Sequence, residues 1–124
     1  MYFGSFSSKS DVCREFGIAD FDGTILFAVY DVGSYEGSAE VIFVNNGAIW
    51  MVQGSHCSCY GLAECQWAPV EMPLDGLRRI VNKGSGLLSN YREAFTEAFS
   101  MIETLNLENA SPDIVTIALK LAFG

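Results

Sequence analysis

The sequence is poor in basic residues: it has seven lysines and arginines and one histidine, against fifteen aspartates and glutamates in 124 residues. The resulting net charge of −8 disfavours direct nucleic-acid binding, which needs a basic surface to meet phosphate. No apolar run approaches the roughly 20 residues of a membrane span, and the first residues lack the sections of a signal peptide. We therefore expect a cytoplasmic protein with no membrane contact, whose four cysteines remain thiols.

The composition predicts a folded chain. Half of the residues are apolar and 13% are aromatic, far from the composition of a disordered segment. A chain of this length is expected to form a single globular domain over residues 1–124, with a core that needs no disulfide or metal.

Segments rich in β-branched and aromatic residues predict three strands. Asn45-Asn46-Gly47 is typical of a tight hairpin turn. Because the apolar runs alternate poorly, both faces of the sheet should be partly covered. We predict a three-stranded antiparallel meander over about residues 24–53. Its strands are expected at residues 24–32, 38–44 and 48–53.

Helical periods and capping residues predict a short N-terminal helix and two or three C-terminal helices. In the longest, apolar residues recur at three- and four-residue steps, and Ser111-Pro112 is a helix start, an N-cap followed by proline. The fold class is therefore α+β, with the meander packed against the C-terminal helices. The helices are expected between residues 10 and 17, 73 and 84, 88 and 105, and 111 and 123.

Residues 20–24, Asp-Phe-Asp-Gly-Thr, match the signature of haloacid-dehalogenase-like phosphatases, in which the first aspartate is a nucleophile and the second a general acid. That family places the motif after a buried parallel strand, whereas here a strand follows it. Asp-Gly is also an ordinary turn dipeptide. We interpret the motif as a turn, and with no convincing nucleophile–base pair we expect no catalytic residues and no enzyme.

Residues 54–67 contain one histidine and three cysteines, and they leave three interpretations open. A zinc site could use four ligands, although the spacing is unusual. A reactive thiol beside the histidine is a second interpretation. The favoured one is a structural loop without a cofactor, rich in turn residues and pinned to the core by Tyr60, Leu62 and Trp67. The zinc alternative would use His56, Cys57, Cys59 and Cys65.

Residues 15–77 contain nine acids and no lysine or arginine. Such a segment would attract a basic partner surface and speed association with it. Exposed aromatic side chains would act as anchors, because aromatic residues are enriched at interface hot spots. The candidate partner-binding residues are Asp20, Asp22, Asp31, Tyr35, Glu36, Glu40, Glu64 and Trp67.

Residues 21–77 resemble a family of small, acidic, uncharacterised proteins of phages and prophages. The resemblance rests on Asp22-Gly-Thr-Ile-Leu-Phe-Ala-Val-Tyr30, on Gly54-Ser-His-Cys-Ser-Cys-Tyr-Gly-Leu62 and on Gln66-Trp67. In those proteins a charged residue or a glycine stands where this chain has Cys65, which disfavours zinc. The resemblance implies a phage setting, inside a bacterial host cell, but no activity.

Together these features favour a non-enzymatic phage protein that binds and inhibits or redirects a host protein. Anti-defence inhibitors of the anti-CRISPR type are one such class, and an acidic surface would occupy a basic, nucleic-acid-binding surface on the host protein. The alternative is a small zinc-binding domain with ligands from residues 56–65. A homodimer through the long helix or the apolar last helix is a further possibility.

Overall fold

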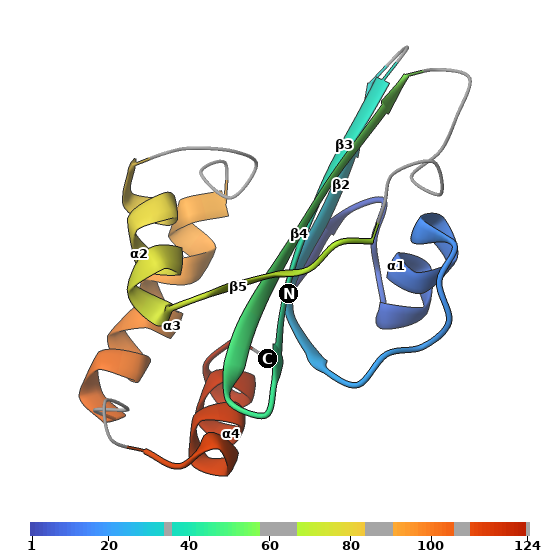
Figure 1. Cartoon of the computed structure of the whole chain (residues 1–124). Helices are drawn as coiled ribbons and strands as arrows, with labels where there is room; N and C mark the ends of the chain where they lie inside the picture. Colours follow the sequence, from blue (N-terminus) through green and yellow to red (C-terminus); the bar gives the residue numbers. More distant parts are fainter. Residues whose placement is uncertain (34–35, 58–66, 84–90, 106–109, 124) are drawn as a thin grey trace.

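The computed structural model describes residues 1–33, 36–57, 67–83, 91–105 and 110–123. Its centre is a five-stranded sheet in the order β1-β2-β3-β4-β5 (Figure 1). The first two strands pair in parallel and the other neighbours are antiparallel. The strands are β1 (Tyr2–Gly4), β2 (Thr24–Val32), β3 (Glu36–Asn45), β4 (Ala48–Cys57) and β5 (Val70–Met72).

The predicted α+β class is confirmed, and the predicted meander is the centre of the sheet, β2 to β4. The strand count of three was wrong, because β1 and β5 add an edge strand on each side. Each of these has three residues, too few to show a period-2 pattern. The fourth strand also continues to Cys57, so the cysteine-rich segment begins as a strand and not as a loop.

The turn between β3 and β4 has the expected hairpin geometry. Asn45 pairs with Ala48, and the two residues between them, Asn46 and Gly47, have φ angles of 52° and 79°. Positive φ at both central positions is the requirement of a type I′ turn, whose twist matches that of the strands. The sequence therefore determines the register of this hairpin locally.

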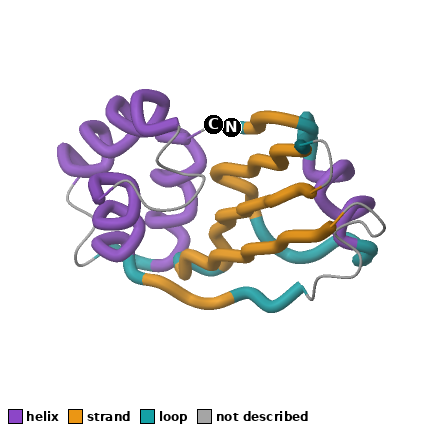
Figure 2. The backbone as a smooth tube through the Cα atoms, turned by 90° about the horizontal axis from the view of Figure 1, so that it is seen from above, coloured by secondary structure: helices purple, strands orange, loops and turns teal. Residues whose placement is uncertain are grey.

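Helices cover both faces of the sheet, as the poor alternation of the strands predicted. The helices are α1 (Lys9–Phe16), α2 (Leu74–Lys83), α3 (Arg92–Leu105) and α4 (Pro112–Phe123). Figure 2 shows helices on both sides of the sheet: α1 packs on one face, and α2, α3 and α4 pack on the other. The long helix begins at residue 92, and residues 88–90 of its predicted span lie outside the described residues.

The first helix begins at Lys9, one residue before its predicted start. Ser8 is its N-cap and accepts a hydrogen bond from the backbone N–H of Asp11 at 3.3 Å. Gly17 ends it in the left-handed conformation, with φ 67°, as predicted for a terminal glycine. At the last helix, Ser111 accepts from the N–H of Ile114 at 3.4 Å, which confirms the predicted start.

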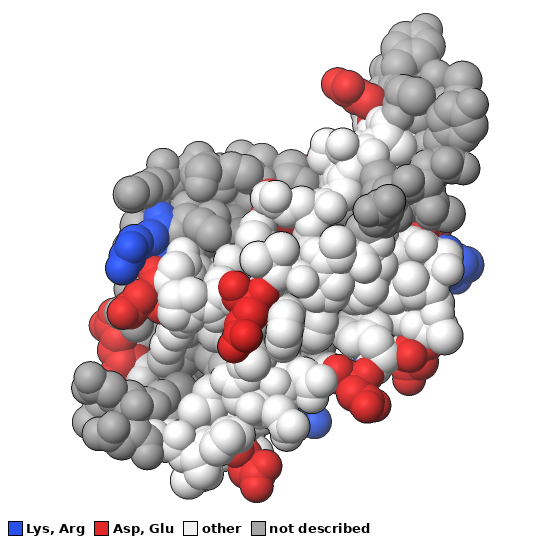
Figure 3. Space-filling view, viewed as in Figure 1, with Lys and Arg blue, Asp and Glu red and all other residues white. Residues whose placement is uncertain are grey.

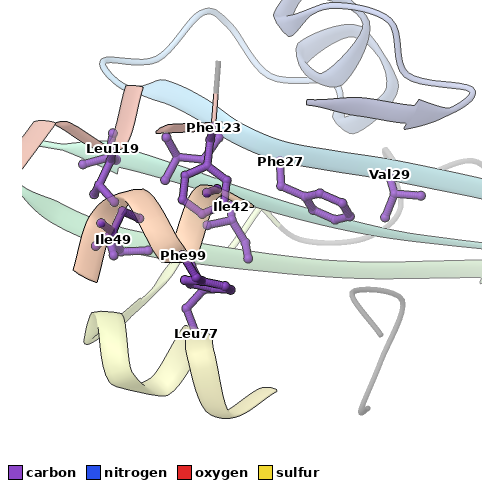
Figure 4. Packing of buried hydrophobic residues seen from close by; sticks show 12 residues of the cluster. Phe27, Val29, Ile42, Ile49, Leu77, Phe99, Leu119 and Phe123 are labelled. Atoms are coloured by element: carbon purple, nitrogen blue, oxygen red, sulfur yellow. The ribbon is translucent and has the colours of Figure 1, made fainter. Parts of the chain in front are cut away.

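The larger core cluster lies between the sheet and the helices α2 to α4, and Figure 4 shows its side chains pointing toward one another from both layers. A second cluster fills the space between the sheet and α1. No helix in the described part of the chain is long and apolar enough to span a membrane. The buried members of the larger cluster are Leu26, Phe27, Val29, Ile42, Val44, Ile49, Leu77, Ala98, Phe99, Ile102, Leu119 and Phe123.

Candidate partner-binding site

The loop between α1 and β2 carries Asp20 and Asp22, and Lys9 organises it. The Lys9 ammonium donates hydrogen bonds to the carbonyl oxygens of Phe21 at 2.6 Å and Gly23 at 3.0 Å. It also forms an ion pair with Asp20, at 3.1 Å, whose side chain is 82% exposed. One side chain from the helix thus fixes three successive points of the loop, and both aspartates remain at the surface.

Aromatic rings of the core pack against the same loop. The Phe21 ring packs against Phe43 and Trp67, with centroid separations of 4.8 and 5.0 Å, and the Lys9 ammonium lies 4.5 Å from the Phe21 centroid. Trp67 also contacts Phe16 of α1 at 5.0 Å. Tilted and edge-on ring pairs at these separations add to the stability that burial itself provides. The loop is therefore held by both polar and apolar contacts.

The hydrogen bond from Lys9 and the charge of its ammonium lower the pKa of the Asp20 carboxyl below its ordinary value. The pKa of Asp11, in α1, is lowered as well. Its carboxylate accepts hydrogen bonds from the backbone N–H of Ser7 and from the side chain of Arg14. Both aspartates therefore stay ionised at neutral pH. Part of their charge is balanced locally by basic residues of the first helix.

The predicted acidic residues do not gather in one patch. Asp20 and Asp22 precede β2, whereas Glu36, which is exposed, opens β3 at the opposite end of the sheet. A nine-residue strand separates these ends by about 27 Å, at roughly 3.3 Å per residue. Figure 3 shows acidic side chains as separate groups divided by uncharged surface. A partner would therefore meet one end of the sheet or the other.

Two of the predicted contact residues lie on the face of the sheet that α2, α3 and α4 cover. Glu40 is 4% exposed and accepts a hydrogen bond from Gln53 at 3.3 Å, so its proposed place at a binding surface was wrong. It shares a face of β3 with Ile42, which belongs to the core. Asp31 is half-buried and accepts from the Tyr91 hydroxyl at 3.5 Å. Burial, and secondly this carboxylate, raise the pKa of Tyr91.

The aromatic anchors have different outcomes. Trp67 is half-buried and stacks on Phe43 at an interplanar angle of 11°, so it secures the chain to the core and is not a free anchor. That contact agrees with the predicted pinning of the cysteine-rich segment by this tryptophan. Tyr35, the other predicted anchor, lies outside the described residues. So do three further predicted residues of the cysteine-rich segment, Tyr60, Leu62 and Glu64.

The stretch without basic residues, 15–77, has bases beside it in space. Lys9 pairs with Asp20 at 3.1 Å, and Arg14 approaches Glu15 at 3.9 Å as well as Asp11, which precedes the stretch, at 2.7 Å. Because α1 packs over the sheet (Figure 1), Lys9 lies beside Asp20, which follows the helix in the chain. Arg14 pairs with acids of its own helix. The acidic surface is thus smaller than the sequence alone suggested.

The possible zinc ligands are only partly described. His56 lies in β4 opposite Gly37, and its Nε2 makes a 2.5 Å hydrogen bond with the Tyr30 hydroxyl. That contact occupies one of the two ring nitrogens with which His56 could bind a metal. His56 and Cys57 are consecutive residues of β4. No group of three metal-ligating side chains occurs among the described residues; Cys59 and Cys65 lie outside them.

The phosphatase-like motif does not have the geometry of that family. Residues 20–24 connect α1 to the start of β2, and β2 pairs antiparallel with β3. The two aspartates therefore precede a strand of a mostly antiparallel sheet, where the family places its aspartates after a parallel strand. The structure agrees with our interpretation of this segment as a turn.

Sequence reasoning missed two features. Lys9 had no signal for its role, because its partners lie 12 and 14 residues away. The contact between Tyr30 and His56 joins two strands that are not neighbours.

Comparison with known proteins found no matching family model, no similar curated protein and no similar solved structure.

Proposed function

We propose that the protein is a non-enzymatic phage protein that binds a host protein and inhibits or redirects it. The observation that carries the proposal is the loop between α1 and β2, which presents Asp20 and Asp22 on a frame held by Lys9 and by the packed rings of Phe21 and Trp67. A loop that is ordered before binding loses less conformational freedom on association than a mobile one. The frame therefore favours a recognition role for these acids.

Asp22 is the centre of the proposed contact. It is exposed, and it takes part in none of the ion pairs found among the described residues. Asp20 already shares its charge with Lys9. A basic surface, of the kind that binds nucleic acid, would be steered to this loop by the net charge of −8, with long-range attraction raising the association rate.

The phage setting is supported by the resemblance of residues 21–77 to small acidic phage and prophage proteins. Inhibitors of host defence, including those of the anti-CRISPR type, can act by occupying a basic nucleic-acid-binding surface. The size and negative charge of this chain suit that mode of action. The target protein and the host system are left to experiment.

Affinity capture with matched variants tests the proposal. Tagged protein is incubated with bacterial lysate at low and moderate salt, and bound proteins are quantified by mass spectrometry. The variants are Asp22→Lys and, as a control with the same change of net charge, Glu97→Lys on α3, where Glu97 is exposed. We expect a stoichiometric basic partner that leaves as salt rises, is reduced several-fold by the first variant and is retained by the second. Equal binding by all three proteins, or no stoichiometric partner, would refute the proposal.

A further inference from the structure

The last helix, α4, is apolar on two sides. Its inner side contributes Leu119 and Phe123 to the core. Its outer side exposes Ile114 (55%), Ile117 (59%) and Leu121 (70%). Residues three and four apart lie on one side of a helix, so these three form a single stripe. Isolated exposed apolar side chains are ordinary, but a continuous stripe along two turns is not explained by the fold of one chain.

The stripe has one acid and one base beside it. Asp113 and Lys120 are both exposed and are seven residues apart, which is two helical turns and about 10 Å along the axis. Asp113 is one turn before Ile117 and Lys120 is one turn after it. Both charges therefore flank the same edge of the stripe, the acid at its N-terminal end and the base at its C-terminal end.

We infer that this stripe is the interface between two copies of this chain, with α4 packed antiparallel against α4 of the second copy. The two-fold axis would pass near Ile117. In that arrangement Asp113 of each copy lies opposite Lys120 of the other, and Ile114 lies opposite Leu121. A two-fold interface requires such a self-complementary pattern. A parallel pair would set Asp113 level with Asp113 and Lys120 level with Lys120, and it would bring no acid beside a base.

The distribution of charge favours a second copy as the occupant. Residues 1–73 carry nine acids and two bases, a net charge of −7, whereas residues 74–124 carry six acids and five bases, a net charge of −1. The segment of α4 is itself neutral, with one acid and one base. The strongly acidic part of the chain includes α1 and its loop, which lie on the other side of the sheet (Figure 1). Self-repulsion is therefore weak at the stripe.

The neighbouring helix, α3, also exposes apolar side chains. Met101 and Leu105 of α3 are 43% and 50% exposed, and in Figure 3 the surface over α4, at the lower end of the view, is mostly uncharged. A stable interface buries about 800 Å² on each partner. A few half-exposed side chains give a smaller contact, so we expect a dimer that forms at micromolar protein concentration.

Sedimentation of the full chain, from low micromolar to several hundred micromolar, tests the inference. The wild type should shift from monomer to dimer, and Leu121→Glu should stay monomeric throughout the range. Val70→Glu is the matched control, because Val70 is 66% exposed on β5, away from α4, and it should dimerise like the wild type. A monomeric wild type, or a dimer that persists in Leu121→Glu, would overturn the inference.

A charge exchange tests the antiparallel register without changing the stripe. Asp113→Lys places lysines opposite lysines and should weaken dimerisation several-fold. The double variant Asp113→Lys with Lys120→Asp restores opposite charges across the axis and should recover most of the affinity. Circular dichroism establishes that each variant is folded. Failure of the exchange to recover dimerisation in folded protein would contradict this register.

Discussion

Tyr30 and His56 meet across the strand that separates them: the Tyr30 hydroxyl and His56 Nε2 form a hydrogen bond of 2.5 Å, on either side of β3. Gly37 of that strand makes the contact possible. A Cβ atom there would collide with the His56 ring and lie 2.9 Å from Cε1 of Tyr30. The contact ties together three strands at the end of the sheet where the cysteine-rich segment begins.

We therefore expect Gly37→Ala to destabilise the protein by about 1–3 kcal/mol, the usual cost of adding an atom to a packed site. Urea denaturation measures the change. Gly33→Ala is the matched control, because the nearest atom to a Cβ there is the Glu36 carbonyl oxygen at 3.5 Å, an ordinary contact. Equal stability of the two variants would show that the rings do not meet over Gly37.

The ion pair of Lys9 and Asp20 should make stability depend on pH in acid. Because the pKa of Asp20 is lowered in the folded state, its contribution is present above the ordinary aspartate pKa of about 3.9. It is lost as pH falls through the lowered folded value. In Lys9→Met this part of the acid sensitivity should disappear, and Asp20 should titrate nearer to its ordinary pKa.

Titration of the Asp20 carboxyl by NMR measures that shift, and denaturation at pH 7 and pH 3 measures the linked stability. Lys120→Met removes the same charge from α4, where the structure gives it no role in the loop, and it should leave the pKa of Asp20 unchanged. An Asp20 pKa that is identical in wild type and Lys9→Met would contradict the ion pair.

Replacement of Trp67 by alanine should cost about 2 kcal/mol, less than the 3–5 kcal/mol typical of a fully buried tryptophan, because its side chain is half-buried. The loss comes from its contacts with Phe16, Phe21 and Phe43. Trp67→Phe keeps a ring in place and should lose about half as much. If Trp67→Ala and Trp67→Phe lose the same free energy of unfolding, the ring contacts contribute little.

An excess of chelator should leave the melting temperature unchanged. The structural reason is that His56 already bonds to Tyr30 and is adjacent to Cys57 in a regular strand. Metal binding and folding are coupled in structural zinc sites, so a fall of several degrees on chelation, with one zinc ion per chain by native mass spectrometry, would instead establish the zinc-binding alternative.

The parts of the fold that were predictable from the sequence are those determined by near neighbours. The Asn46-Gly47 turn sets the pairing of β3 with β4, and Ser111 and Gly17 mark helix ends through their own backbone contacts. The strand β1 has no such signal. Its three residues pair in parallel with β2, 26 positions further along the chain, and only the folded sheet brings these strands together.

The candidate site was less predictable, because burial and pairing depend on distant segments. Glu40 could have been placed from its own strand, since alternate residues share a face and it stands two positions before the core residue Ile42. Nothing near Asp20 in the sequence indicates that Lys9 neutralises it. A charge count along the chain treats these acids alike, whereas the fold buries Glu40 and pairs Asp20 with Lys9.

The hydrogen bond from the N–H of Gly47 to the Thr116 hydroxyl, at 2.9 Å, joins positions 69 residues apart. Closing so long a loop costs more entropy than forming a hairpin, and contacts distant in sequence form slowly. We expect the meander to form first and α4 to dock last, an order that pulsed hydrogen exchange would reveal as early protection in β3 and β4. Until the C-terminal helix has docked, the apolar residues of the sheet that it covers, Ile42 and Ile49 among them, are open to chaperones and to other chains.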